Sequence, residues 1–119
     1  MDTLTRAVIR QLGGRESLAD VARHGADGGY HGFTYYADTV RFAKRHKAAI
    51  LERLARDADA MGERSVAALV TRFRCVNATE DEVARVLYGA GGDADVRRHV
   101  LNALAWYALE EVAIEQEDA

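Results

Sequence analysis

Apolar residues recur every three or four positions along most of this chain, which is the spacing of one face of an α-helix. Clusters of glycine interrupt the periodic stretches, and the sequence contains no proline. The spacing predicts five or six helices, over about residues 4–12, 18–24, 38–60, 66–73, 80–88 and from 94 onwards. Only residues 33–35 suggest a short extended stretch, so we expect an all-α fold.

Two of the predicted helices begin at side chains suited to capping. Thr79 opens a capping box with the glutamate three residues later, and Asp38 or Thr39 can accept a hydrogen bond from the first turn of the third helix. Within that third helix, Lys47 falls on the apolar side. Its position predicts either a break near His46 or a lysine whose stem is buried while its ammonium reaches a polar group.

The last predicted helix is apolar around nearly its whole circumference between residues 100 and 109. A helix of this kind is covered by others, so we expect it at the centre of the domain. One polar and aromatic stripe runs along it, because His99, Asn102, Trp106 and Glu110 follow one another at intervals of three or four. The stripe either recognises a partner or satisfies its polar groups against the glycine-rich segment or the third helix.

Length and composition indicate one domain, residues 1–119, in a reducing compartment. Hydrophobic residues make up 49% of the chain and charged residues 29%, which is typical of a globular protein. No apolar run reaches the ~20 residues that span a bilayer, and the first residues lack the pattern of a secretory signal. Cys75 is the only cysteine, which excludes an internal disulfide. We expect a cytosolic protein without a membrane segment.

The net charge of −3 is unevenly distributed along the chain. Residues 1–60 carry ten Lys/Arg against eight Asp/Glu, whereas residues 61–119 carry six against eleven. This asymmetry affects how partners are steered, and the overall acidity disfavours a general nucleic-acid binder. Residues 110–118 hold five acids, which oppose the dipole at a helix C-terminus. We therefore expect a solvated tail; the alternatives are contact with the basic third helix or with a basic patch on a partner.

The segment 25–36 differs from the helices in composition. It holds four of the ten glycines and three of the five tyrosines, and it is too aromatic for a plain linker. We expect it to fold back against the last helix, which would bury some of Phe33, Tyr35 and Tyr36. Tyrosine and arginine are the residues that most often anchor interfaces. The residues expected to bind a partner are Tyr30, His31, Tyr35, Arg41 and Arg45.

The basic third helix supports an alternative function. Residues 41–56 contain six Lys/Arg and one acid. Such a face could follow phosphates, with Tyr35 and Tyr36 nearby for stacking. A nucleic-acid-binding accessory or regulatory protein is therefore the alternative, and the chain is expected to be a monomer or a homodimer.

Catalytic motifs are not found in the sequence. Asp20, His24, Asp27 and His31 are candidate metal ligands within twelve residues, but their spacing matches no zinc or calcium motif. Cys75 lacks a neighbouring histidine and is typical of a small core residue. No phosphate-cradling loop or dinucleotide fingerprint is present. We expect no enzyme activity, no metal and no cofactor.

Two blocks carry a resemblance to a known group of proteins. The run Gly-Ala-Asp-Gly-Gly-Tyr-His-Gly-Phe-Thr-Tyr-Tyr-Ala-Asp-Thr at 25–39 and the run Asn-Ala-Leu-Ala-Trp-Tyr-Ala-Leu-Glu-Glu-Val at 102–112 look like a family of small uncharacterised proteins from bacteriophages and other mobile elements. The resemblance implies a compact accessory protein that binds a host or phage protein complex. An inhibitor of a host defence system, of the anti-CRISPR kind, is one form of such a protein. The resemblance supplies no catalytic residues.

Overall fold

All regular structure in the described part of the chain is helical. The computed structural model describes residues 2–14, 18–24, 30–57, 63–73, 78–89 and 91–118. The helices are, in chain order, α1 (Thr3–Leu12), α2 (Leu18–His24), α3 (Tyr36–Asp57), α4 (Glu63–Phe73), α5 (Glu80–Tyr88) and α6 (Ala94–Asp118). The all-α prediction is confirmed. None of the described helices combines the length and the hydrophobicity that a membrane crossing requires.

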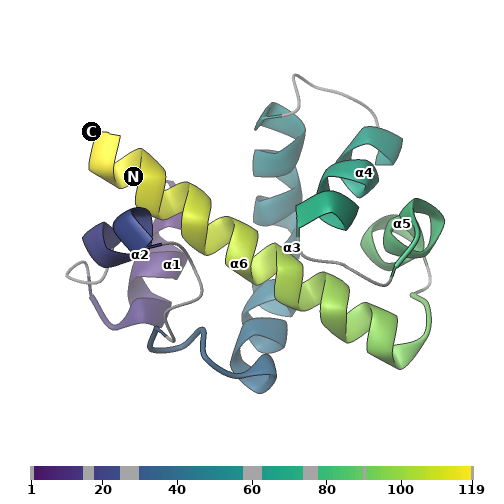
Figure 1. Cartoon of the computed structure of the whole chain (residues 1–119), viewed down its shortest axis with the longest axis horizontal. Helices are drawn as coiled ribbons and strands as arrows, with labels where there is room; N and C mark the ends of the chain where they lie inside the picture. Colours follow the sequence, from purple (N-terminus) through teal and green to yellow (C-terminus); the bar gives the residue numbers. More distant parts are fainter. Residues whose placement is uncertain are drawn as a thin grey trace.

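α6 is the helix on which the others pack. It contacts each of the other five, and Figure 1 shows it crossing the middle of α3, with α1 and α2 towards its C-terminal end and α5 towards its N-terminal end. Between residues 100 and 109 only Asn102, Trp106 and Tyr107 are not fully buried. The Cα radius of gyration of 13.5 Å is that of a compact chain of this length. The predicted burial of the C-terminal helix is confirmed.

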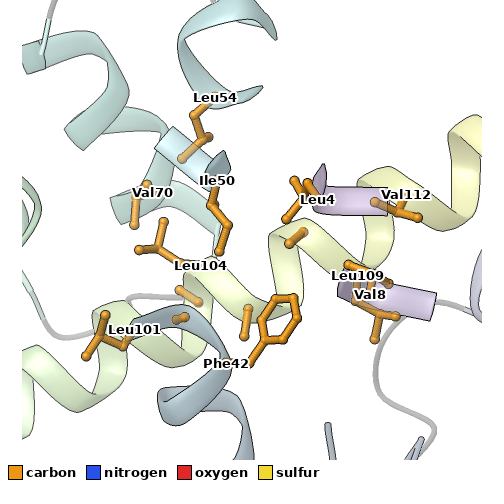
Figure 2. Packing of buried hydrophobic residues seen from close by; sticks show 14 of the residues in the cluster. Leu4, Val8, Phe42, Ile50, Leu54, Val70, Leu101, Leu104, Leu109 and Val112 are labelled. Atoms are coloured by element: carbon orange, nitrogen blue, oxygen red, sulfur yellow. The ribbon is translucent and has the colours of Figure 1, made fainter. Parts of the chain in front are cut away.

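The core is continuous along the buried face of α6. Figure 2 shows Leu4 and Val8 of α1 close to Leu109 and Val112 of α6. Further along α6, Leu104 lies among side chains of α3 and α4, and it is fully buried. Because both ends of α6 contribute to one cluster, the N-terminal and C-terminal parts of the chain belong to the same domain.

The observed helix starts confirm one predicted cap and correct another. Thr79 and Glu82 form the predicted capping box of α5, with Thr79 Oγ1 accepting from the Glu82 amide and Glu82 Oε1 accepting from the Thr79 amide. α3, however, begins at Tyr36, so Asp38 and Thr39 lie inside its first turn. The predicted cap is therefore wrong, because the Thr39 hydroxyl is committed to a neighbouring helix instead.

That neighbouring helix is α6, and the polar stripe meets α3 within the molecule. The hydroxyl of Thr39 donates to Asn102 Oδ1 at 2.6 Å, and Thr39 is 1% exposed. One turn away, the Tyr36 hydroxyl and His99 Nδ1 lie 3.3 Å apart, with the two rings edge to face. The intramolecular interpretation of the stripe is confirmed for these two residues, and the contacts fix where α3 crosses α6.

α3 contains the predicted irregularity near its middle. His46 has non-helical backbone angles, with φ −113° and ψ 16°, which divide the helix at a kink. Directly after the kink, Lys47 is half-buried and its Nζ donates to the carbonyl of Val86 at 2.8 Å. That carbonyl lies in the last turn of α5, where the helix dipole favours a cation. The predicted break near His46 and the predicted lysine with a buried stem and a bonded ammonium are therefore both confirmed.

Arg53, in the C-terminal half of α3, forms ion pairs with residues near both ends of the chain. Arg53 is only 4% exposed, and its guanidinium lies 2.7 Å from Asp2 Oδ2 and 2.6 Å from Glu115 Oε2. Asp2 also caps α1 by accepting from the Thr5 amide at 2.8 Å, and this hydrogen bond, followed by the arginine, lowers the pKa of the Asp2 carboxyl. The acidic end is helical to Asp118, and the alternative expectation, contact with the basic third helix, is confirmed for Glu115.

The loop before α3 is attached to the core by one aromatic side chain. Phe33 is fully buried, with its ring centroid 5.2 Å from Phe42 in an edge-to-face contact and 6.1 Å from Trp106. Tyr35 is 71% exposed and Tyr36 is 47% exposed. The loop does fold back towards α6 as predicted, but it buries the phenylalanine and leaves the two tyrosines at the surface.

Replacing Phe33 by alanine should destabilise the protein strongly. Large-to-small substitutions of buried phenylalanine cost about 3–5 kcal/mol, because a cavity remains where the ring was. We expect a large decrease in the midpoint of urea unfolding, followed by circular dichroism. Tyr35→Ala, two residues away at an exposed position, is the control and should change the free energy of unfolding by less than about 0.5 kcal/mol. Equal effects of the two substitutions would contradict the assigned burial.

Candidate partner-binding face

A shallow hollow lies where the end of α1 meets the loop before α3. Its volume is about 470 Å³, and it is bounded by three segments: the last turn of α1, the loop and the first turn of α3. The lining residues are Arg10, Gln11, His31, Gly32, Thr34, Tyr35 and Asp38. Two of the predicted binding residues, His31 and Tyr35, therefore line the same hollow.

A second hollow adjoins the first along α3. It measures about 230 Å³ and is lined by Gln11, Asp38, Arg41, Phe42, Arg45 and His46. Gln11 and Asp38 line both hollows, so the two form one surface. We call this surface the loop–α3 face and define it by Arg10, Gln11, His31, Tyr35, Asp38, Arg41, Arg45 and His46.

The loop that forms the floor of this face is held in one conformation. The Phe33 amide donates to the Tyr30 carbonyl at 2.9 Å, and Gln11 Nε2 donates to the Gly32 carbonyl at 2.8 Å. Gly32 has φ +79°, and a Cβ atom there would lie 2.2 Å from the backbone oxygen of Gln11. Only glycine fits such a left-handed and closely packed position. The chain is therefore fixed on both sides of His31.

The electrostatics of the face are dominated by cations. Arg41 and Arg45 lie one turn apart on the N-terminal half of α3, and Arg10 approaches from α1. Asp38 lies 3.9 Å from Arg41, but among the described residues no carboxylate lies within ion-pair distance of Arg45. Like charges one turn apart destabilise a helix by about 0.2–0.5 kcal/mol. Helix stability does not account for this arrangement.

The surroundings of His46, including two of these cations, lower its pKa. Its ring is half-buried and lies 4.8 Å, centroid to centroid, from the Phe42 ring. Burial, and then the positive charges of Arg45 and Arg10, lower the pKa of His46 below its ordinary value of 6.5. The imidazole is therefore neutral near pH 7, and it offers the face a hydrogen-bonding group without a further charge.

Tyr30 does not share the surface of the other four predicted residues. Its side chain is half-buried against the core, and its hydroxyl donates to the carbonyl of Asp20 at 3.1 Å. The Tyr30 carbonyl also accepts from the Thr34 hydroxyl at 2.9 Å. These contacts make Tyr30 a support of the loop conformation, and the loop–α3 face is built by its neighbours.

Sequence reasoning missed the contribution of α1 to the face. Arg10 lies on the side of that helix opposite to its buried residues, where a charged residue is ordinary, and Gln11 is half-buried at the edge of the buried face. Only the short turn at Gly13 signals that the end of α1 returns towards the loop. Among the residues that the structure describes, no group of three or more potential metal ligands occurs. Cys75 and Asp27, and the side chain of His24, lie outside the described residues.

The arrangement defines an all-helical domain that presents aromatic and cationic side chains on a preformed surface. The chain belongs to the family described as a domain of unknown function, DUF7222, which matches residues 8–116. The match includes α2 to α5 completely, the second half of α1 and most of α6. A search of curated proteins found no match, and a search of solved structures found none either.

Substituting Gly32 by alanine should disturb the loop. The positive φ and the contact with the Gln11 backbone both oppose a side chain, and strain of this kind costs about 1–3 kcal/mol. We expect a lower midpoint of urea unfolding and shifted amide resonances at His31 and Tyr35. Gly92→Ala is the matched control, since a Cβ there meets Val86 at an ordinary 3.9 Å. Unchanged amide shifts in the Gly32 variant would contradict the proposed fixed loop.

Histidine titration tests the electrostatics of the face. In a pH series of ¹H–¹³C spectra, His46 should titrate below 6.5, and Arg45→Gln should raise its pKa because one nearby positive charge is removed. Lys44→Gln removes a cation that does not shift His46, and should leave its pKa unchanged. Because the unfolded chain binds the proton more readily than the folded protein, His46 should lower the free energy of unfolding as the pH falls below 6.5. A pKa above 6.5 would refute the assigned environment.

Proposed function

We propose that this chain is a non-enzymatic accessory protein that binds another protein through the loop–α3 face. The observation that carries the proposal is an exposed tyrosine on a fixed loop, placed beside arginines that helix stability does not explain. Tyr35 is 71% exposed, and Arg10, Arg41 and Arg45 line the hollows beside it. Tyr and Arg are enriched among the residues that contribute most to binding energy.

The fixed loop supports a binding role for thermodynamic reasons. Ordering a loop on binding opposes association, and a loop that is already ordered avoids this cost. Phe33 in the core, the Gln11 hydrogen bond and the glycine at 32 keep the loop in place without a partner. The Tyr35 ring is therefore presented to the partner at low entropic cost.

The charges of the face favour an acidic partner surface. Three arginines surround the hollows, and Asp38 is the single carboxylate in their lining. Opposite charge on the partner would relieve the repulsion among these arginines and steer the encounter. The resemblance to proteins of bacteriophages and other mobile elements suggests a host complex as the partner, including a defence complex that this chain would inhibit.

Nucleic acid is the alternative partner, because phosphates would also satisfy the arginines. The hollows are small and lie beside one exposed tyrosine, which suits individual protein side chains better than a row of stacked bases. The whole chain is acidic, with a net charge of −3. We therefore place protein binding first.

Affinity purification with matched variants tests the proposal. The tagged protein would be expressed in a host cell, and the recovered proteins quantified by mass spectrometry after nuclease treatment. Tyr35→Ala combined with Arg45→Ala should reduce the recovery of partners at least about tenfold, since each anchor residue contributes about 2 kcal/mol. Arg85→Ala combined with Tyr88→Ala removes an exposed arginine and an exposed tyrosine from α5, and should leave recovery unchanged.

Two outcomes would contradict the proposal. Equal recovery of the same proteins by the Tyr35/Arg45 variant would show that the loop–α3 face is not the binding surface. Loss of all partners after nuclease treatment would show that nucleic acid, and not protein, is bound. Circular dichroism of each variant would establish that the fold is retained, which is expected because the substituted side chains are exposed.

A further inference from the structure

A wedge-shaped hollow opens on the other side of α3, where this helix and α6 diverge. The two helices are joined by the hydrogen bond between Thr39 and Asn102, and the hollow lies on the N-terminal side of that contact on α6. Its volume of about 650 Å³ exceeds that of either hollow of the loop–α3 face. Arg41 lines both this hollow and the smaller of those two, so it forms the ridge between them. We call the hollow the α3–α6 wedge.

The floor of the wedge is aliphatic. Ala37 and Val40 of α3 face Ala94 and Leu101 of α6 across it. Leu101 is nearly completely buried and Val40 is half-buried, so the floor is an extension of the hydrophobic core to the surface. A ligand that fills this floor removes apolar surface from water, which contributes about 25 cal/mol per Å².

The rims of the wedge are cationic on both sides. Arg41 and Lys44 come from α3, and Arg97 and Arg98 come from α6. Arg98 pairs with Asp95, whereas within the described residues no carboxylate lies within ion-pair distance of Lys44 or Arg97. The Arg97 guanidinium is held at its place by a hydrogen bond to the Gly92 carbonyl at 3.3 Å.

Two helix N-termini add to the positive potential. Tyr36 and Ala94 are the first residues of α3 and α6, and both line the wedge. Each N-terminus carries the positive end of a helix dipole, equivalent to about half an elementary charge, although the Asp93 carboxylate caps α6 by accepting from the amides of Asp95 and Val96.

Arg41 and Arg98 have carboxylate partners, whereas Lys44 and Arg97 leave positive charge on each rim. The occupant must therefore combine negative charge at its edges with an apolar centre.

We propose that the wedge binds an acidic amphipathic helix of the partner protein, with aliphatic side chains on the floor and carboxylates towards both rims. The proposal rests on the proposed function and names the segment of the partner that is recognised. Single-stranded nucleic acid fits less well, because bases need exposed aromatic rings and Tyr36 is the single aromatic residue of the lining. Its ring already packs edge to face on His99.

Fluorescence anisotropy with defined probes tests this inference on the full chain. The first probe is a labelled peptide of about four helical turns, with leucines along one face and glutamates on both sides of them. In a second peptide serines replace the leucines, and in a third glutamines replace the glutamates. The fourth probe is an oligothymidylate with the same number of charges. We expect the first peptide to bind at least about tenfold more tightly than each of the other three, since both apolar contact and charge contribute.

Variants assign the binding to the wedge. Lys44→Gln combined with Arg97→Gln should weaken binding of the first peptide at least about tenfold. Tyr35→Ala combined with Arg45→Ala leaves the wedge intact and should change it by less than about threefold. This pair of variants separates the two proposals: a failure of the loop–α3 face would appear as retained cellular partners, whereas a failure of the wedge would appear as unchanged peptide affinity in the Lys44/Arg97 variant.

Three further results would overturn the inference. Equal affinity for the leucine and serine peptides would mean that charge alone is recognised. Tighter binding of the oligothymidylate would assign the wedge to nucleic acid. No binding of the first peptide at low ionic strength, where charge attraction is strongest, would show that the wedge does not accept an acidic helix.

Discussion

Burial of the central part of α6, residues 100–109, is the constraint on which the rest of the structure depends. A helix that is apolar around its circumference must be covered by other helices, and each large side chain buried there contributes about 1.5–3 kcal/mol. Small residues such as Ala105 and Ala108, both fully buried, let neighbouring helices approach closely. Asn102 is one of the few polar residues in this stretch, and its hydrogen bond with Thr39 sets the point where α3 crosses. The direction of α3, and with it the position of the loop–α3 face and of the α3–α6 wedge, follows from covering α6.

α3 uses arginine in two physically different ways along its length. In the C-terminal half, Arg53 is buried and its charge is matched by Asp2 and Glu115, as a charge removed from water requires. In the N-terminal half, Arg41 and Arg45 remain exposed and lie one turn apart. The buried arginine attaches residues near both ends of the chain to α3. The exposed pair of arginines costs stability, and a cost retained at a hollowed surface is the usual mark of a functional site.

Local sequence patterns were sufficient to predict the helices and much of their packing. The capping box at Thr79, the burial of residues 100–109 and the irregularity at His46 all depend on residues close to one another in the chain. The predictions failed or stayed open where distant segments decide. Thr39 has the side chain of a helix cap, but its hydroxyl is taken by a residue of α6, and the acidic C-terminal end is held by an arginine 62 positions earlier.

The candidate site shows the same division between local and long-range information. The exposed tyrosine and the arginines of α3 could be named from composition, because residue type and helical spacing are local properties. Arg10 joins the loop–α3 face, and Arg97 and Arg98 join the α3–α6 wedge, because of how α1 and α6 pack against α3. No periodicity reveals such packing. Separation of the basic surface into a hollow with an exposed aromatic and a hollow with an aliphatic floor is therefore a property of the fold.

The loop connects the core with the binding surface over a very short distance in the chain. Phe33 is fully buried, and Tyr35, two residues later, is mostly exposed. Between α1 and this loop, the Gln11 hydrogen bond and the close approach at Gly32 leave little room for adjustment. The position of the Tyr35 ring is thus set by the packing of Phe33 against Phe42 and Trp106, not by the loop alone. Because Trp106 belongs to α6, the geometry of the surface and the stability of the core are consequences of the same contacts.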